Sequence, residues 1–261
     1  MTSRSRFAMA DRTAVDLAAI DAWVVALDDA AATISTDVLS ADEIARAERF
    51  VFDRDRRRFI VCRRALRHVL SGYTGIAPEA LVFAYGRNGK PALEGTEGSV
   101  ASNVSHAEER AVIAVSGAAD LGVDVECTMR TVDFEGLADR FFSSVESAEL
   151  RSLPARERRQ AFYNCWTRKE AYIKATGDGL TCPLQSFAVT LQTAAPPAFR
   201  WIEGDTAADW RLFAFSPAPT YVGAVATRAP IDSIRLRRFE LPASSAIPVA
   251  IGAGVDGRGP A

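Results

Sequence analysis

The sequence predicts an α+β fold, because helical segments and short strand-like segments occupy different stretches of the 261-residue chain. Helices are expected within residues 40–71 and over residues 156–176. Short apolar runs separated by Gly, Pro and Asn are found within residues 81–126 and 187–227. Hydrophobic residues make up 48% of the chain and charged residues 25%, which is typical of a globular protein with a buried core. The length allows one large domain or two of roughly 130 residues.

The N-terminal elements are expected in the order strand, helix, helix. Residues 1–14 are polar and aperiodic, which predicts a flexible leader, and residues 22–27 form a short apolar run typical of a buried strand. Ser40 followed by Glu43 is a capping-box signature, and it predicts a helix that continues to about Phe52. A second helix is predicted over residues 56–71, with an apolar stripe made of Phe59, Cys62, Leu66 and Val69.

This second helix and its approach are rich in arginine. Between Arg46 and Arg67 there are nine arginines and three acidic residues, a local net charge of +6 in a chain whose formal net charge is −2. The faces of the predicted helix away from its apolar stripe carry Arg57, Arg58, Arg63, Arg64 and Arg67. A local basic surface in a nearly neutral protein favours a small anionic ligand, and it gives no reason to expect a nucleic-acid binder.

The C-terminal part repeats some of these signals. Residues 111–116 and 121–126 flank a turn, which predicts an antiparallel hairpin. Ser143 and Glu146 form a second capping box, and a long helix is expected over residues 156–176. Further strands are expected near residues 187–191, 210–216 and 221–227. The tail beyond residue 241 is rich in Ala, Gly and Pro, which predicts a flexible segment.

The two halves of the chain carry similar series of signals. Each has a capping box, an arginine-rich approach and a longer helix that ends in Thr-Gly, at residues 74–75 and 176–177. The capping boxes are 103 residues apart and the Thr-Gly pairs are 102 residues apart. The chain therefore contains an internal duplication, or the match is a coincidence of common capping residues. We expect an N-terminal subdomain over 15–120, a C-terminal subdomain over 121–240 and a tail over 241–261.

Membrane insertion and export are not expected. The apolar, uncharged stretches 212–227 and 241–255 are shorter than the ~20 apolar residues of a spanning helix and contain prolines. The N-terminus lacks the apolar segment of a signal peptide. The four cysteines are scattered without a C-x-x-C pair, which is typical of reduced thiols in a cytoplasmic protein.

Four side chains could form a phosphate-handling or metal-binding centre. Asp124 and Glu126 share one face of a predicted strand, since side chains alternate along a strand. That face is the solvent-exposed side of a hairpin, or it is a site for a hard cation such as Mg²⁺. Glu170 and Lys174 lie on one face of the long helix. They form a surface ion pair, or a carboxylate that binds metal or accepts a proton beside a cation that stabilises phosphate.

Two other polar stretches could contact phosphate. Ser105 and His106 are adjacent residues and no G-x-S-x-G elbow is present, so we reject a nucleophile–base pair and favour a hydroxyl and an imidazole that contact a phosphate. Residues 85–91 form a glycine-containing turn with Lys90. This turn does not have the spacing of a P-loop and taken alone is more typical of a hairpin.

Taken together, four stretches resemble the 4′-phosphopantetheinyl transferases, in particular the surfactin-synthetase-activating type. In chain order they are N-G-K-P at 88–91, N-V-S-H at 103–106, G-V-D-V-E at 122–126 and W-T-R-K-E-A-Y-I-K at 166–174. The resemblance covers about residues 22–227, and the last stretch matches at its defining positions Trp166, Lys169, Glu170 and Lys174. Such proteins are pseudo-dimers of two similar α/β subdomains related by pseudo-twofold symmetry, with coenzyme A in the cleft between them. This favours the duplication.

The resemblance also implies a role for each matching residue. Asp124, Glu126 and Glu170 would hold Mg²⁺, or Mn²⁺, together with the pyrophosphate of coenzyme A. Glu170 would also be the base for the acceptor hydroxyl, and Lys174 would offset charge on the pyrophosphate. The remaining matches would bind coenzyme A: Lys90 and Pro91 on the adenine side, and Ser105, His106, Arg46 and Arg58 at or near the 3′-phosphate. Glu43 departs from the family pattern, in which several relatives have Lys, so Arg49 or Arg57 could replace Arg46 at that phosphate.

The implied activity is Mg²⁺-dependent transfer of 4′-phosphopantetheine from coenzyme A to a serine of an acyl or peptidyl carrier protein, by a cytoplasmic monomer. A metal ion, a lysine and an arginine cluster suit phosphoryl transfer, which needs charge neutralisation more than covalent chemistry. Two alternatives remain. One is a non-catalytic relative that binds coenzyme A, and the other is a metal-dependent nucleotide pyrophosphate hydrolase.

Overall fold

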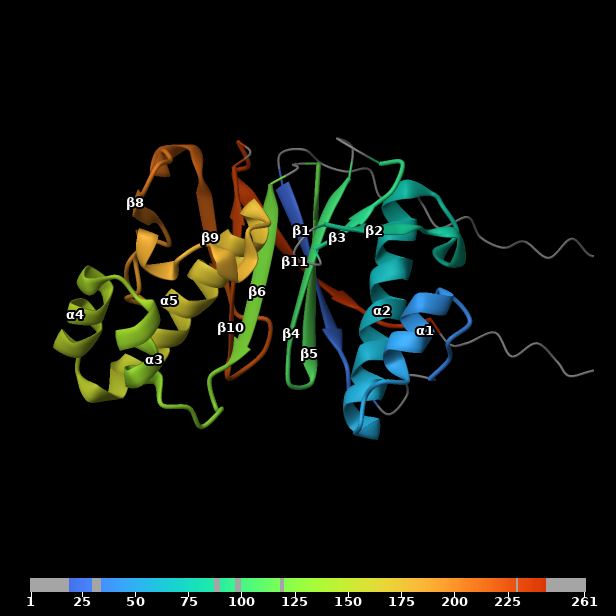
Figure 1. Cartoon of the computed structure of the whole chain (residues 1–261), viewed down its shortest axis with the longest axis horizontal. Coiled ribbons are helices and arrows are strands. Elements are labelled where there is room, and N and C mark those ends of the chain that lie inside the picture. The colour runs from blue at the N-terminus through green and yellow to red at the C-terminus, as the bar shows by residue number, and fades with distance from the viewer. Residues whose placement is uncertain are drawn as a thin grey trace, which may run out of the picture.

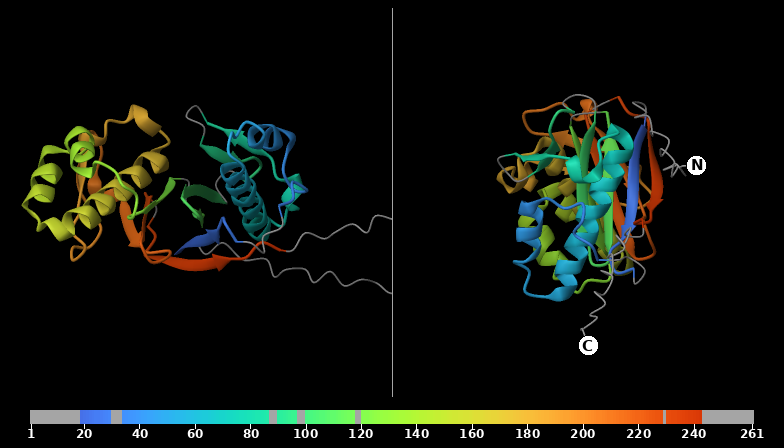
Figure 2. Two further views of the ribbon diagram at one scale, coloured as in Figure 1. Left: turned by 90° about the horizontal axis from the view of Figure 1, so that it is seen from below. Right: turned by 90° about the vertical axis from the view of Figure 1, so that its right-hand side faces the viewer.

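The chain folds into two similar halves that pack together through their β-sheets (Figures 1 and 2). The structure is a computed structural model, and it describes residues 19–29, 34–86, 90–96, 100–117, 120–228 and 230–242. The leader predicted at 1–14 and all of the predicted tail beyond residue 242 lie outside these residues. Within the described ranges, no helix has the length and apolar character needed to cross a membrane.

Four strands form the N-terminal sheet, in the order β11-β1-β5-β4. Strand β1 (Ala19–Ala26) pairs antiparallel with β5 (Arg110–Ser116), which in turn pairs antiparallel with β4 (Ala101–Ala107). Strand β11 (Ser233–Phe239) comes from the end of the described chain and runs parallel to β1. The long helix α2 (Asp53–Thr74) covers one face of this sheet and buries Cys62, Leu66 and Val69 of its predicted apolar stripe against it. Phe59, the first residue of that stripe, is only partly buried and lies outside this core.

Strand β5 contributes to two cores at once. Ile113 and Val115 pack against α2, whereas Val112 and Ala114 face the second sheet. All four side chains are 1% exposed or less. A strand that is buried on both faces needs an apolar residue at nearly every position, and the sequence Ala-Val-Ile-Ala-Val supplies them.

The C-terminal sheet has the order β6-β10-β9 and is entirely antiparallel. Its strands are β6 (Leu121–Cys127), β10 (Tyr221–Thr227) and β9 (Arg211–Phe215). Helix α5 (Ala155–Thr176) packs on one face, and the other face packs against the N-terminal sheet. The molecule therefore has four layers, α2, two sheets and α5, which Figure 1 shows from right to left.

Smaller elements complete each half. The short helices are α1 (Ala41–Ala47), α3 (Phe134–Phe141) and α4 (Ser144–Ser152). The hairpins are β2 (Phe83–Tyr85) with β3 (Pro91–Leu93), and β7 (Phe187–Val189) with β8 (Phe199–Ile202). Single 3-10 turns cover Pro78–Ala80, Gly179–Thr181, Leu184–Ser186 and Ala207–Asp209.

The two halves repeat one arrangement, as the similar series of sequence signals predicted. Strands β1, β5 and β4 correspond in order and pairing to β6, β10 and β9. Helices α2 and α5 both have 22 residues and both end at a glycine C-cap in the left-handed region, Gly75 with φ 74° and Gly177 with φ 79°. A capping box precedes each helix, in which Glu43 or Glu146 accepts a hydrogen bond from the N-cap serine N–H.

These two glutamates are buried, and the long helix that follows each of them neutralises it. Arg67 pairs with Glu43 at 2.7 Å, and Lys169 pairs with Glu146 at 2.8 Å. Both cations are the fifteenth residue of their helix. Both also donate to two backbone carbonyls beyond the helix end, Pro78 and Leu81 for Arg67, and Leu184 and Phe187 for Lys169. Lys169, a defining position of the last motif, therefore ties α5 to the chain that follows it.

Two secondary-structure predictions are wrong. The helix expected from Ser40 to about Phe52 ends at Ala47, and Phe52 is instead the N-cap of α2. Residues 111–116 and 121–126 are strands but do not form a hairpin, since β5 and β6 belong to different sheets and β5 pairs with β4. Strict alternation predicts two strands but not their partners, and here the apolar faces of β5 and β6 are buried against each other's sheets.

Three arginines of the second helix do not contribute to the local basic surface that the sequence predicted. Arg63, Arg64 and Arg67 are 7% exposed or less. They are buried because Glu43, which is 2% exposed, and Asp37 lie beside them and neutralise their charge. The basic surface is therefore smaller than the local charge of +6 indicates.

Strand β11 returns from the C-terminal half to the free edge of β1, where Asp21 holds it. Asp21 is 2% exposed and lies 103 residues before Asp124. It accepts hydrogen bonds from Arg235 Nε and Arg237 Nε, both at 2.7 Å, and from the Tyr73 hydroxyl at 2.5 Å. The Asp21 carboxylate, 103 residues before Asp124, is thus neutralised by two arginines of the chain itself.

Candidate active site

A cavity of about 520 Å³ lies between the two halves and holds most of the predicted site residues. Its walls come from α1, α2, β3 and β4 of the N-terminal half and from β6 and α5 of the C-terminal half. Eight of the ten predicted residues line it: Arg46, Pro91, Ser105, His106, Asp124, Glu126, Glu170 and Lys174. The fold thus gathers side chains that are more than a hundred residues apart in sequence.

The alternation of β6 places its two acidic side chains on one face, toward this cavity. Val123 and Val125 belong to the core between the sheets, and Gly122, Asp124 and Glu126 lie on the other face, toward α5. Asp124 is 5% exposed. The sequence left open whether this face is a solvent-exposed side of a hairpin, and the structure shows that it is covered.

Gly122 allows α5 to pass directly over β6. A Cβ atom at this position would lie 2.1 Å from the carbonyl oxygen of Ala171 and 2.3 Å from the backbone nitrogen of Ala175. Any other residue would push the helix away from the strand. The glycine of the G-V-D-V-E stretch therefore brings Glu170 and Lys174 of α5 close to the acidic side chains of β6.

Asp124, Lys174 and Ser105 form one hydrogen-bonded cluster in the cavity. Lys174 Nζ lies 2.6 Å from Asp124 Oδ1 and 3.0 Å from Ser105 Oγ. The Ser105 hydroxyl donates to the same Asp124 oxygen at 2.9 Å. This cluster joins β4, β6 and α5. Ser105 therefore orients the Asp124–Lys174 ion pair.

Carboxylate oxygens without a hydrogen-bond donor lie beside this cluster. Asp124 Oδ2 and Glu126 Oε2 are buried and accept no hydrogen bond from the residues that the structure describes. Glu126 Oε2 lies 3.5 Å from a guanidinium nitrogen of Arg130. Burial and the charge of Asp124 raise the pKa of Glu126 to about 7, and the same two causes raise the pKa of Glu170. A cation bound among these carboxylates would compensate the buried oxygens and lower both pKa values.

The wall from the N-terminal half is cationic. The Arg46 guanidinium lies 5.4 Å from the ring centroid of Phe59, and both residues line the cavity. Arg63 lines it as well, and its Nε donates to Glu43 Oε1 at 2.6 Å. Glu43 therefore does not oppose an anion in the cavity, because it is buried behind Arg63 and neutralised by Arg63 and Arg67.

Comparison with known proteins identifies the family to which the chain belongs. A family model described as the 4′-phosphopantetheinyl transferase superfamily matches residues 120–226, and one described as 4′-phosphopantetheinyl transferase, N-terminal, matches residues 23–118. The 4′-phosphopantetheinyl transferase HetI of Nostoc sp. is 41% identical over 202 residues, which are 77% of this chain and 81% of that protein. The chain belongs to the 4′-phosphopantetheinyl transferase family.

Other relatives of this transferase are similar over comparable regions. The 4′-phosphopantetheinyl transferase psf-1 of Bacillus pumilus is 33% identical over 74% of this chain and 80% of its own length. Sfp of Bacillus subtilis is 31% identical over 59% of this chain and 66% of its own length. Among solved structures, the holo-[acyl-carrier-protein] synthase of Thermotoga maritima matches with 19% identity and a TM-score of 0.33, over 41% of this chain and 61% of its own.

Two predicted residues of the transferase do not line the cavity. Arg58 pairs with Asp28 at 2.6 Å and with Glu108 at 3.5 Å, so its charge is neutralised elsewhere. Lys90 Nζ donates to the carbonyl oxygens of Leu121 and Ala175, at 3.0 and 3.1 Å. Burial lowers the pKa of Lys90. Lys90 thereby links the β2–β3 hairpin to the start of β6 and the end of α5.

The cavity of the transferase also contains residues that the sequence did not indicate. These are Phe59, Cys62, Arg63, Val104 and Val125. Trp166, a defining position of the last motif, lines the cavity as well. Arg63 could have been found from its position four residues after Phe59, on the helix face next to the apolar stripe. Burial raises the pKa of the Cys62 thiol to about 11, so this cysteine is a wall of the cavity and not a nucleophile.

The donor set fits a divalent cation that a phosphate ligand helps to hold. Among the residues that the structure describes, none donates a hydrogen bond to the buried oxygens Asp124 Oδ2 and Glu126 Oε2, and oxygen is the ligand type that Mg²⁺ prefers. In the part of the chain that the structure describes, no three Asp, Glu, His or Cys side chains are close enough together to enclose an ion. The expected set of Asp124, Glu126 and Glu170 is thus incomplete as a cage. It fits an ion bound by one or two carboxylates and by phosphate oxygens.

The raised pKa of Glu126 predicts how stability changes with pH. A carboxyl whose pKa is about 7 in the folded state, above its ordinary value of 4.5, destabilises the fold increasingly as pH rises between those values. In metal-free buffer we expect Glu126→Gln to be more stable than the wild type by about 2 kcal/mol at pH 8, and equally stable near pH 4.5. Urea unfolding at both pH values measures this difference. The same difference in free energy of unfolding at both pH values would contradict the raised pKa of Glu126.

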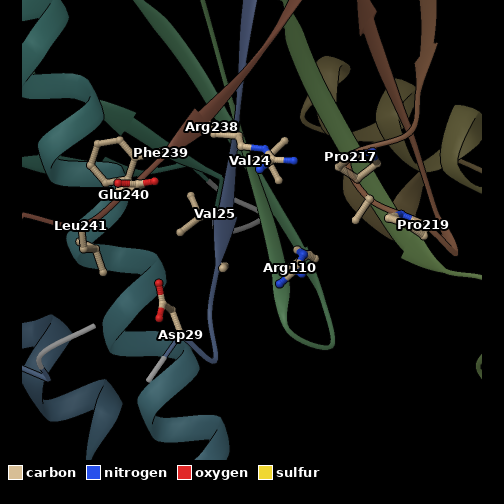
Figure 3. A pocket seen from close by; sticks show the side chains of 12 residues that line it. Val24, Val25, Asp29, Arg110, Pro217, Pro219, Arg238, Phe239, Glu240 and Leu241 are labelled. Carbon is tan, nitrogen blue, oxygen red and sulfur yellow. The ribbon is translucent and has the colours of Figure 1, made fainter. Parts of the chain in front are cut away.

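A second cavity, of about 410 Å³, lies where β11 joins the N-terminal half. Figure 3 shows Arg110 and Arg238 on the strands of the first sheet, with Pro217 and Pro219 of the β9–β10 turn across from them. None of the ten predicted residues lines this cavity. The candidate active site is therefore the cavity that contains Asp124.

Proposed function

We propose that this transferase moves 4′-phosphopantetheine from coenzyme A to the hydroxyl of a serine in an acyl or peptidyl carrier protein, and that it releases 3′,5′-ADP. The observation that carries this proposal is the single cavity in which Asp124, Glu126 and Glu170 meet Lys174 and a wall with Arg46 and Arg63. A donor with three phosphoryl groups suits a cavity that offers both cationic side chains and carboxylates for a divalent cation.

Each side chain of the cluster has a chemical task in this reaction. Glu170, with its raised pKa, takes the proton from the serine hydroxyl as the oxygen attacks phosphorus. Lys174 Nζ stabilises the negative charge that develops on the bridging oxygen of the pyrophosphate as the bond from this oxygen to the attacked phosphorus breaks and 3′,5′-ADP leaves. Asp124 and Glu126 would hold Mg²⁺, or Mn²⁺, which when bound neutralises phosphate charge. The Ser105 hydroxyl hydrogen-bonds to both Lys174 and Asp124 and so fixes their relative orientation.

The finer assignments belong to the same proposal. We place the transferase in the surfactin-synthetase-activating type because its two halves form one chain with a site between them. We propose that it acts as a monomer in the cytoplasm, since β11 already covers the free edge of β1. The four cysteines are free and three of them are buried, as is usual for reduced proteins.

One experiment separates this function from its alternatives. The protein is incubated with coenzyme A, Mg²⁺ and a panel of apo carrier domains, and each carrier is weighed by mass spectrometry. We expect a mass gain of one phosphopantetheinyl group on at least one carrier. Binding of coenzyme A without any mass gain would leave a non-catalytic binding protein, and 3′,5′-ADP released in the absence of carrier would indicate a hydrolase.

His106 gives a sharper prediction about the donor. Its side chain is exposed at the cavity, and the resemblance places it at the 3′-phosphate of coenzyme A. We expect His106→Ala to weaken binding of coenzyme A about tenfold, the size of a lost charge-assisted hydrogen bond, and to leave 3′-dephospho-coenzyme A almost unaffected. Isothermal titration with both ligands measures this. Equal losses for the two ligands would contradict the role.

A further inference from the structure

Three apolar residues in succession are exposed between α1 and α2. The exposed fractions of Phe50, Val51 and Phe52 are 37%, 89% and 67%. We call these three residues the apolar ridge. Contiguous exposed apolar side chains mark sites of interaction with other molecules far more often than single ones do.

The local structure gives no reason for the residue at position 52. Phe52 is the N-cap of α2 and makes no side-chain capping hydrogen bond. Ser, Thr, Asp and Asn are preferred at this position because they satisfy a free backbone N–H, as Ser143 does at the start of α4. A helix that gives up its cap for an exposed aromatic ring departs from local rules without gain to the fold, and such departures are expected at functional surfaces.

The ridge is continuous with the wall of the active-site cavity. The ring of Phe50 lies 5.4 Å from the ring of Phe59, and the Arg46 guanidinium lies 5.4 Å from that same ring. Both Phe59 and Arg46 line the cavity. On the side of the C-terminal half, Met129 is 68% exposed in the turn that follows β6, three residues after Glu126. The start of α2 and the turn after β6 both lie along the lower edge of Figure 1.

The surroundings of the ridge are basic. Arg49, Arg56 and Arg57 are exposed, and none of them makes a salt bridge with another residue that the structure describes. Arg54 is exposed too and pairs only with its neighbour Asp55 among these residues. An acidic partner would supply the counter-charges that the fold does not.

From these observations we propose that the apolar ridge, together with Met129, is the surface on which the acceptor domain docks. The partner it fits is an acidic carrier domain with an apolar side chain close to its acceptor serine. The ridge would take that side chain, the arginines would steer the acidic face, and the serine would enter the cavity toward Glu170. This inference rests on the proposed function, because it needs an acceptor that must reach Glu170.

The test compares two variants with a matched control. Val51→Ser/Phe52→Ser makes the ridge polar, and Leu236→Ser does the same to a residue of β11 that is 47% exposed and lies outside the cavity. We expect the ridge variant to lower kcat/KM for an apo carrier domain at least tenfold, mainly through KM, and to weaken direct binding of that carrier in titrations. Its affinity for coenzyme A should stay within twofold of the wild type. Leu236→Ser should match the wild type in every measurement.

The second variant, Arg54→Glu/Arg56→Glu, tests the charge. At low salt we expect it to lower kcat/KM for the carrier about tenfold and to remove most of the salt dependence seen in the wild type. This variant decides the matter if the serine variant does not fold, and a wild-type kcat/KM at low salt would then overturn the proposal.

The outcomes also separate this inference from the proposed function. If the wild type modifies carriers and a folded Val51→Ser/Phe52→Ser protein has the same carrier KM, the docking surface is elsewhere and the proposed function stands. If the wild type modifies no carrier, the proposed function fails, and the docking proposal fails with it unless the titrations show carrier binding at the ridge. A dimer that the serine variant dissociates would show that a second copy of the chain occupies the ridge, which would also overturn the proposal.

Discussion

Replacing Glu170 by glutamine is expected to lower kcat for transfer about a thousandfold, within the range that loss of a general base produces. Glutamine keeps the shape of the side chain and removes both the charge and the capacity to accept a proton. The carboxylate is suited to this task because burial and the nearby Asp124 raise its pKa, and because it lines the same cavity as Lys174. Single-turnover assays with an apo carrier measure the loss directly.

Coenzyme A should still bind to the Glu170→Gln protein, since the cationic wall with Arg46 and Arg63 is intact. A matched control is Glu157→Gln, which makes the same change on an exposed residue of the same helix. We expect the control to keep the wild-type rate. Turnover near the wild-type value in Glu170→Gln would show that another group takes the serine proton.

The sequence places the side chains of the site on their strand and helix faces, but it does not predict how these faces meet. Asp124 and Glu126 could be assigned to one face of a strand from alternation, and Glu170 and Lys174 to one face of a helix from spacing, because both rules act within a few residues. Their meeting depends on Gly122, which was recognised as part of a motif and not as the contact point of β6 and α5.

The errors arise where long-range contacts decide. Strand β5 was assigned to a hairpin with β6, but both of its faces are buried and its true partners, β1 and β4, lie on either side of it. The assignment of Arg58 and Lys90 to coenzyme A stays a prediction. In the structure, Arg58 pairs with Asp28 and Glu108, and Lys90 donates to two backbone carbonyls. A charge in the sequence shows that a counter-charge is needed, and only the fold shows whether a ligand or the protein supplies it.

Glu43 illustrates the same point in the opposite direction. From the sequence, an acid among arginines is expected to weaken a phosphate site at Arg46. The structure places it in a capping box, 2% exposed, between Arg63 and Arg67. Its counterpart Glu146 occupies the same place in the second half, where a single lysine is its only cationic partner among the described residues. The duplicated fold therefore contains one buried carboxylate with two cations and one with a single cation.

This difference predicts unequal costs for two corresponding substitutions. Lys169→Met leaves Glu146, which is 0% exposed, without a positive charge, and it removes the donor to the Leu184 and Phe187 carbonyls. We expect it to lower the free energy of unfolding by about 4 kcal/mol, the usual cost of breaking a buried ion pair. Arg67→Met also removes a donor to two carbonyls, but Glu43 keeps Arg63, so we expect a loss of only about 2 kcal/mol.

Urea unfolding of both proteins measures the two losses, and Glu146→Gln/Lys169→Met isolates the effect of charge. With the carboxylate neutralised as well, the double variant should recover about half of what Lys169→Met loses, because a buried pair replaced as a whole costs less than one that is broken. Equal losses for Lys169→Met and Arg67→Met, with no recovery in the double variant, would mean that the lost carbonyl hydrogen bonds dominate at both sites. Lys169 would then stabilise α5 through its backbone contacts alone, and the second cation beside Glu43 would be without energetic consequence.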